Sequence, residues 1–299
     1  MPSISRRRTS TSLTDFSDAT SRYPPALLEQ RARVAEKGTF RQRVQFDLVD
    51  RPQHAFGLLA AADIASFTGI DEIVALEFGV AEGAGLRNLA EVASLVTDET
   101  GVGVDVVGFD SGEGLPAPVD HRDHPEIWVA GDFAMPDPAA IQAMLPPGAD
   151  LVLGPIATTL PQFVKTLAKP IGFVSFDLDL YSSTRDALAV FEIECDRLLP
   201  VVVSYFDDVI GGIRRIGSLF RTRAAGQLRA IEEFNAARSV RRIDPIWVLR
   251  HRRPLDREMW IERMYALHVL DHPIRSAQRS RPAMSMREHG QSTEFDWPL

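Results

Sequence analysis

The chain has 299 residues, of which 45% are hydrophobic and 25% charged, so it can bury a sizeable core and is not compositionally disordered. Its formal net charge of −8 argues against a general nucleic-acid binder, because neutralising phosphates requires a surplus of Lys and Arg. Cys195 is the only cysteine, which excludes an intrachain disulfide and a multi-cysteine metal site. We expect it to be a buried structural thiol, which suits a reducing cytoplasm.

Both ends of the chain are predicted to lie outside the folded domain, which we place at 23–272. Residues 1–22 are rich in Ser, Thr and Arg without the apolar stretch of a signal peptide, and we expect a disordered tail. Residues 273–299 lack periodicity and are predicted to be flexible. No segment approaches the roughly 20 apolar residues of a membrane span. We therefore expect a cytoplasmic protein without membrane contact; the oligomeric state, a homo-oligomer included, stays open.

Short apolar runs alternate with helical patterns along the domain. A helix over Ala55–Phe67 ends at Gly69 and leads into the core. Strands are then expected at Ile73–Phe78, Val104–Phe109, Leu151–Leu153, Ile171–Phe176 and Val201–Phe206. The intervening helices are expected at Gly85–Val96, Pro138–Met144, Leu160–Ala168 and Arg185–Leu199. Near-continuous apolar strands separated by helices indicate a parallel sheet covered on both faces, so the predicted class is α/β, doubly wound.

The pattern changes after the fifth of these strands. A helix over Gly226–Ala237 is followed by two strand candidates, Ile246–Arg250 and Met264–Leu270. The polar stretch His251–Arg257 between them is short enough for a hairpin. We therefore predict an antiparallel strand pair that closes one edge of the sheet.

A glycine-rich turn follows the first predicted strand. Its glycines at Gly79, Gly83 and Gly85 permit a tight turn and a close approach of backbone to a ligand. In doubly wound folds a ligand binds at the carboxyl ends of the strands, which is where this turn lies. The spacing G-x-x-x-G-x-G differs from the dinucleotide pattern G-x-G-x-x-G and disfavours an NAD site. Glu77, just before the turn, suits a cationic aminoacyl sulfonium better than a pyrophosphate.

Further cofactor-binding candidates follow the second strand. Asp110 stands at its tip, where a carboxylate can accept hydrogen bonds from both hydroxyls of a ribose, and Ser111 follows it. Asp132 and Phe133, which precede the third strand, could place a polar group and an aromatic ring beside an adenine, although a surface turn is an equally good interpretation. The segment Ser111–Ile127 has the glycines and prolines of a mobile loop over the cleft.

Two acidic pairs follow two neighbouring strands. Asp177 and Asp179 come after the fourth strand, and Asp207 and Asp208 after the fifth. Since adjacent parallel strands bring their carboxyl ends together, these four side chains should converge at one edge of the cleft. Crowded carboxylates repel one another, and a hard divalent cation such as Mg²⁺ relieves that repulsion. Helix capping by single aspartates is the alternative interpretation.

Taken together, these stretches resemble the class I S-adenosylmethionine (SAM)-dependent O-methyltransferases, of the macrocin or mycinamicin type. The matching residues are Glu77-Phe78-Gly79 with Gly83, Gly108-Phe109-Asp110-Ser111 with Gly114-Leu115-Pro116, Asp177 to Thr184, and Phe206-Asp207-Asp208. The resemblance implies a Rossmann-like fold whose last strands form the antiparallel edge. It implies that Asp177, Asp207 and Asp208 bind the metal and that Asp179, near the acceptor hydroxyl, is a candidate base.

The sequence therefore predicts a methyltransferase that uses SAM and a divalent cation such as Mg²⁺ on a hydroxyl group of a small molecule. A bound cation lowers the pKa of the acceptor hydroxyl, and Asp179 could take its proton. Two alternatives stay open: an NAD(P)-binding oxidoreductase, and a noncatalytic protein that retains the fold. Transfer to nitrogen or carbon is a further variant. His54, at the start of the first core helix, could also face the pocket.

Overall fold

The structure is a computed structural model that describes residues 23–210 and 222–276. The tail predicted at 1–22 lies outside the described residues, as does 277–299. Pro273–Ser276, which we predicted to be flexible, forms the short helix α12. In the described part of the chain, no helix combines the length and the apolar character that crossing a membrane would need.

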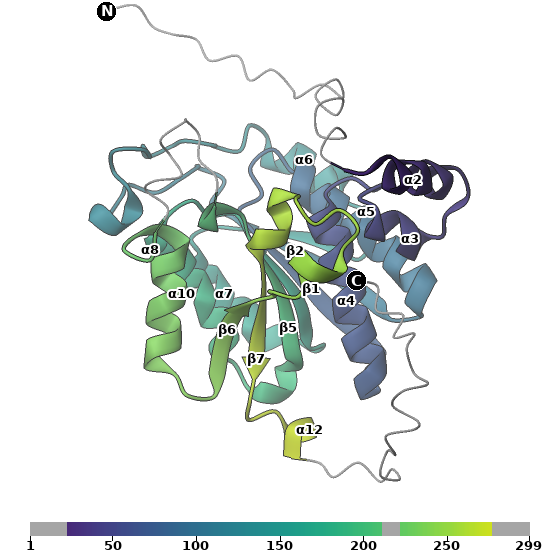
Figure 1. Cartoon of the computed structure of the whole chain (residues 1–299). Helices are drawn as coiled ribbons and strands as arrows, with labels where there is room; N and C mark the ends of the chain where they lie inside the picture. Colours follow the sequence, from purple (N-terminus) through teal and green to yellow (C-terminus); the bar gives the residue numbers. More distant parts are fainter. Residues whose placement is uncertain (1–22, 211–221, 277–299) are drawn as a thin grey trace, which may run out of the picture.

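A seven-stranded sheet with the order β3-β2-β1-β4-β5-β7-β6 forms the centre of the molecule (Figure 1). The strands are β1 (Glu72–Phe78), β2 (Gly103–Asp110), β3 (Ala149–Leu153), β4 (Ile171–Phe176), β5 (Leu198–Phe206), β6 (Arg241–Pro245) and β7 (Met264–Val269). The first five are parallel, and β7 runs antiparallel to both β5 and β6. The predicted fold class, a doubly wound α/β sheet with an antiparallel C-terminal pair, is confirmed.

Helices cover both faces of the sheet. The longer ones are α2 (Pro25–Lys37), α4 (Pro52–Thr68), α5 (Ala84–Thr100), α7 (Ile156–Thr166) and α10 (Gly226–Ala237); the shorter ones are α3 (Phe40–Gln45), α6 (Pro138–Met144), α8 (Tyr181–Ala187) and α11 (Leu249–Arg252). Helices α4 and α5 lie on one face, and α7, α8 and α10 on the other (Figure 1). Because both faces are covered, β1 and β4 are almost entirely buried, as their apolar sequences require.

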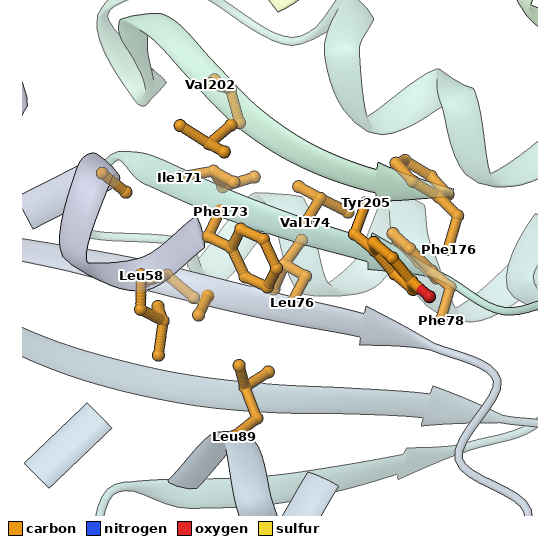
Figure 2. Packing of buried hydrophobic residues seen from close by; sticks show 14 of the residues in the cluster. Leu58, Leu76, Phe78, Leu89, Ile171, Phe173, Val174, Phe176, Val202 and Tyr205 are labelled. Atoms are coloured by element: carbon orange, nitrogen blue, oxygen red, sulfur yellow. The ribbon is translucent and has the colours of Figure 1, made fainter. Parts of the chain in front are cut away.

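Four phenylalanines form a row across the carboxyl ends of the central strands. Phe78 lies opposite Phe109 and Phe176 in the sheet register, and Phe176 lies opposite Phe206. Their ring centroids are 5.0, 5.4 and 4.5 Å apart along the row. Figure 2 shows Phe78 and Phe176 together near the ends of their strands. Aromatic pairs of this kind contribute about 0.5–1.5 kcal/mol each beyond their buried area.

This row of rings fixes the register of the strand ends. The residue after each phenylalanine is therefore held at one edge of the sheet, and these residues are Gly79, Asp110, Asp177 and Asp207. Packing of the core thus determines which polar side chains meet at the cleft.

Three predicted elements need correction. The strand expected at Ile246–Arg250 is wrong: β6 lies earlier, at Arg241–Pro245, and the later residues form a turn and α11. The hairpin loop expected at His251–Arg257 is correspondingly a longer connection that contains α11 and the 3₁₀ turn η7 (Met259–Arg263). The apolar residues from Ile246 onward suggested a buried strand, but Trp247 among them is 64% exposed. The actual strand, β6, is charged because it lies at the edge of the sheet.

The helix expected at Arg185–Leu199 is also too long. Helix α8 ends at Ala187, and the 3₁₀ turns η4 (Leu188–Glu192) and η5 (Cys195–Arg197) connect it to β5. Cys195 consequently lies in η5 and is half-buried instead of buried.

Candidate functional site

A cleft of about 910 Å³ opens at the carboxyl ends of β1, β2, β4 and β5. Among the residues predicted for the site, those lining the cleft are Glu77, Gly79, Asp110, Ser111, Phe133, Asp177, Asp179, Asp207 and Asp208. Gly83 and Asp132 are not lining residues. Instead, Gly83 is the residue before α5, with a positive φ of 81°, and the Asp132 carboxylate accepts a hydrogen bond from the backbone amide of Val129 within its own loop.

The turn after β1 approaches the neighbouring strand closely. A Cβ on Gly79 would lie 2.0 Å from the carbonyl oxygen of Asp177, and its φ is +90°. Only glycine fits there without displacing backbone. The glycine therefore brings the turn of β1 against the end of β4, which places the two halves of the cleft side by side.

Asp110 holds the glycine-rich turn in place. Its Oδ2 accepts hydrogen bonds from the backbone amides of Val80 and Ala81, at 2.8 and 2.9 Å, and its Oδ1 accepts one from Gly112 at 2.7 Å. A carboxylate has about four acceptor positions, so Oδ1 retains one for a ligand hydroxyl. Ser111 is used locally as well: its hydroxyl donates to the carbonyl of Gly114 at 2.9 Å.

Glu77 is a buried acid at the inner end of the cleft. It is 4% exposed, and burial raises its pKa to about 8, with Asp110 adding to the rise and Arg51 opposing it. Its Oε1 lies 2.1 Å from where a Cβ of Gly85 would be. In the described structure, Gly85 therefore makes room for the Glu77 side chain, a role the sequence did not reveal.

Carboxylate oxygens of Asp177, Asp207 and Asp208 lie within 4.8 Å of one another. Asp177 follows β4, whereas the other two begin the 3₁₀ turn η6 (Asp207–Val209) after β5. Asp208 is buried, Asp207 half-buried, and Asp177 open to the cleft. Loss of hydration, followed by repulsion from Asp207 and Asp208, raises the pKa of Asp177 well above its usual value.

Asp208 is fixed from two sides. Its backbone amide donates to Oε1 of Gln227 on α10 at 2.8 Å, and Gln227 Nε2 donates in turn to the carbonyl of Phe176 at 3.3 Å. Its Oδ2 accepts a hydrogen bond from the backbone amide of Asp179 at 2.8 Å. Gln227 is completely buried, so these bonds link α10 rigidly to the ends of β4 and β5.

Asp207 is paired with an arginine that the sequence did not single out. Arg263 at the end of η7 contacts Asp207 Oδ1, and the hydroxyl of Tyr205 donates to the same oxygen at 2.6 Å. Arg263 also donates to the carbonyl of Ile210 at 3.1 Å. The three aspartates and Arg263 together carry a formal charge of −2 when all are ionised, which one divalent cation would balance.

The donor set fits a hard divalent cation. All candidate ligands are carboxylate oxygens, which Mg²⁺ and Ca²⁺ prefer, and oxygens on opposite sides of such an ion are about 4–5 Å apart. The separations in the acidic cluster, which we define as Asp177, Asp207 and Asp208, match that span.

The loop predicted to be mobile is anchored at one point. The carboxylate of Asp123, which is fully buried, accepts hydrogen bonds from the backbone amides of Val119 and Ser182, at 2.8 and 2.7 Å. Arg122 donates to the hydroxyl of Tyr181 at 2.7 Å. The loop is therefore attached at this point to α8, whose Ser183 and Asp186 line the cleft.

Arg51 also lines the cleft, next to the start of α4. The sequence analysis did not predict Arg51 or Arg263 as site residues, because neither of them follows a strand. In the sequence Arg51 is marked only by the proline after it, and Arg263 only by its place before a predicted strand.

Comparison with known proteins gives distant structural similarity only. No protein-family model matches the sequence, and no curated protein matches it. Among solved structures, the calicheamicin methyltransferase CalS11 aligns over 79% of this chain and 91% of its own, with a TM-score of 0.45 and 17% identity. The O-methyltransferase from Bacillus cereus in complex with SAH aligns over 86% and 97%, with a TM-score of 0.41 and 15% identity. Because these similarities are distant, the function has to be inferred from the residues that line the cleft.

Proposed function

We propose that this chain is a SAM-dependent methyltransferase that acts, with a divalent cation, on a hydroxyl group of a small molecule. The observation that carries the proposal is the position of the acidic cluster. It lies in the same cleft as Glu77 and Asp110, so a cofactor site and a cation site would be contiguous.

One half of the cleft suits the cofactor. Glu77 offers a buried carboxyl group for a cationic aminoacyl group, and Asp110 offers an acceptor for a ribose hydroxyl. Phe133 lines the cleft and packs edge-on against Trp128, with ring centroids 6.0 Å apart, which gives an apolar wall for a base. When bound, the cofactor would supply a methyl group on a sulfonium.

The other half suits a hydroxyl acceptor. Asp177, Asp207 and Asp208 would hold the cation, whose chemistry is to lower the pKa of a nearby hydroxyl. Asp179 lines the cleft next to them, and its carboxylate would accept the acceptor's proton. The loop anchored by Asp123 would exclude water from this end.

Methyl transfer tests the proposal. The purified chain would be incubated with methyl-labelled SAM and a panel of sugars, phenols and other hydroxyl compounds, with Mg²⁺ or with EDTA. We expect label transfer to at least one acceptor with Mg²⁺, and little with EDTA or in Asp207→Asn. Asp150→Asn, on the exposed side of β3, is the matched control and should transfer normally. Transfer to a hydroxyl compound that is unaffected by EDTA would contradict the role of the cation.

A further inference from the structure

Asp207 uses one of its two carboxylate oxygens for bonds within the protein. Its Oδ1 accepts a hydrogen bond from the hydroxyl of Tyr205 at 2.6 Å and is also contacted by Nη1 of Arg263. A carboxylate oxygen has about two acceptor positions, so Oδ1 is filled. Among the described residues, none donates a hydrogen bond to Oδ2. Asp207 therefore has a single oxygen left for a ligand.

Arg263 is brought to this carboxylate by the antiparallel edge of the sheet. It ends η7, and the next residue, Met264, lies opposite Tyr205 in the register of β5 and β7. The Nη1 of Arg263 donates to the hydroxyl oxygen of Tyr205 at 3.0 Å, and its Nη2 donates to the carbonyl of Ile210 at 3.1 Å. Arg263 thus contacts both ends of η6, the turn that carries two of the three acidic side chains.

The number of oxygens that a carboxylate can offer separates the divalent cations. Ca²⁺ takes about six to eight oxygen ligands and can bind both oxygens of one carboxylate, whereas Mg²⁺ needs near-octahedral geometry and keeps several waters. A carboxylate limited to one oxygen therefore suits Mg²⁺ better than Ca²⁺. At Asp208 an oxygen is partly occupied as well, because Oδ2 accepts the backbone amide of Asp179. The bonds around the acidic cluster thus restrict how many oxygens it can offer.

Arg263 also changes the charge at the acidic cluster. It is half-buried, as is Asp207, so water and salt screen its charge less than that of a surface residue. This charge repels any divalent cation, whatever its size. The filled oxygen of Asp207 acts differently, because it disfavours Ca²⁺ more than Mg²⁺. The charge therefore alters the affinity for both ions, whereas the filled oxygen alters the ratio of the two affinities.

We propose that Arg263 and Tyr205 determine which cation the acidic cluster prefers. By filling Oδ1 of Asp207, they restrict this ligand to one oxygen and shift the preference of the cluster from Ca²⁺ toward a small octahedral ion such as Mg²⁺. Both are positioning residues, since they act on the cation through Asp207. The inference rests on the proposed function, in which a divalent cation binds at the acidic cluster.

Competition between cations measures this preference without turnover. The full chain would be titrated with Mn²⁺, the free ion being followed by its electron paramagnetic resonance signal, and Mg²⁺ or Ca²⁺ would then displace it. The readout is the ratio of the Ca²⁺ affinity to the Mg²⁺ affinity. Removing the charge of Arg263 strengthens the binding of either ion, and loosening Asp207 weakens it, so the single affinities are less informative than their ratio.

Variants assign the effect to the two residues. Arg263→Met should raise the ratio about tenfold, the low end of the effects that such outer contacts have on metal affinity. Tyr205→Phe removes one donor without a change of charge and should raise the ratio by less. Arg263→Lys keeps the charge and a donor, and should stay near the wild-type ratio. Arg250→Met is the matched control, because Arg250 pairs with Glu262 and its loss changes the net charge equally; both affinities should be unchanged.

The outcomes separate this inference from the proposed function. A substitution that only destabilised η6 would lower both affinities alike and leave the ratio as in the wild type. An unchanged ratio in Arg263→Met and in Tyr205→Phe, in proteins that still bind Mn²⁺, overturns the inference and leaves the proposed function intact. If Arg263→Met does not fold, Tyr205→Phe carries the test alone. If the wild type binds none of Mn²⁺, Mg²⁺ and Ca²⁺, the cation of the proposed function fails, and the inference fails with it.

Discussion

The backbone amide of Asp179 donates a hydrogen bond to Oδ2 of Asp208, at 2.8 Å. This bond holds Asp179 in a left-handed conformation with φ = 59°, which non-glycine residues rarely adopt. The candidate base is therefore tied directly to the acidic cluster, at the cost of local backbone strain. Such strain is typical of functional sites.

Replacing Asp179 with Asn should separate chemistry from folding. Asn tolerates the left-handed conformation well, so the midpoint of thermal unfolding should stay unchanged. Loss of a general base should lower kcat by about 10²–10⁴-fold, with little change in cofactor affinity. Parallel measurements of thermal unfolding, kcat and S-adenosylhomocysteine affinity check this. Unchanged kcat would mean that Asp179 is not the base.

Asp207→Asn should weaken cation binding more than cofactor binding. The substitution removes one of three negative charges and leaves Arg263 without its ionic partner. Calorimetric titration with Mn²⁺ as a probe should show an affinity loss of tenfold or more, on the order of the 1.4 kcal/mol that one decade represents. Asp150→Asn, which changes the net charge equally, should bind Mn²⁺ as the wild type does. Equal affinities in all three proteins would contradict a cation site at the acidic cluster.

Arg253→Met should destabilise the fold in a pH-dependent way. Arg253 is buried and donates to Oδ1 of Asp47 at 2.8 Å, so its loss leaves a buried carboxylate unpaired. Breaking such a pair costs about 3–5 kcal/mol. Burial raises the pKa of Asp47 to about 6, against the opposing effect of Arg253, and the unfolded value is about 3.9.

The sign of the pH effect follows from this rise. An acid whose pKa is higher in the folded state makes the free energy of unfolding fall as the pH rises between the two values, here from about 4 to about 6. Without Arg253 the pKa of Asp47 rises further, and the fall extends to higher pH. Urea unfolding should therefore show a larger loss at pH 8 than at pH 5. A loss independent of pH would argue against an ionised Asp47.

Asp123→Ala should loosen the loop over the cleft. The change leaves the buried backbone amide of Ser182 without its acceptor, which costs about 1–3 kcal/mol, and also removes the acceptor of the Val119 amide, which belongs to an exposed residue and can bond to water instead. We expect lower stability in urea and faster hydrogen exchange at these amides. Asp123→Asn, which keeps a single acceptor oxygen, should lie between Ala and the wild type. Unaltered exchange in Asp123→Ala would show that other contacts hold the loop.

Much of the site could be predicted because strand ends are readable in sequence. Asp110, Asp177 and Asp207 each follow an apolar strand, and parallel register brings such positions to one edge of the sheet. Glu77 was readable for the same reason, as the polar residue before the glycine-rich turn. The phenylalanines in register at the strand ends explain why the residues that follow them lie together in the cleft.

Other features depend on contacts between distant parts of the chain. Arg263 contacts Asp207 from a connection 56 residues later in the chain. No local sequence pattern indicates a contact between residues so far apart. The role of Gly85 as space for Glu77, and the anchoring of Asp123 to α8, likewise appear only after folding. The edge strand β6 was misplaced because it is charged, while the apolar residues after it lie at the surface.

The most direct test of the account is a calorimetric titration of the full chain with S-adenosylhomocysteine and, separately, with NADH, each with and without Mg²⁺. We predict saturable binding of one S-adenosylhomocysteine per chain and no binding of NADH. Binding of NADH without binding of S-adenosylhomocysteine would contradict the account and favour an oxidoreductase.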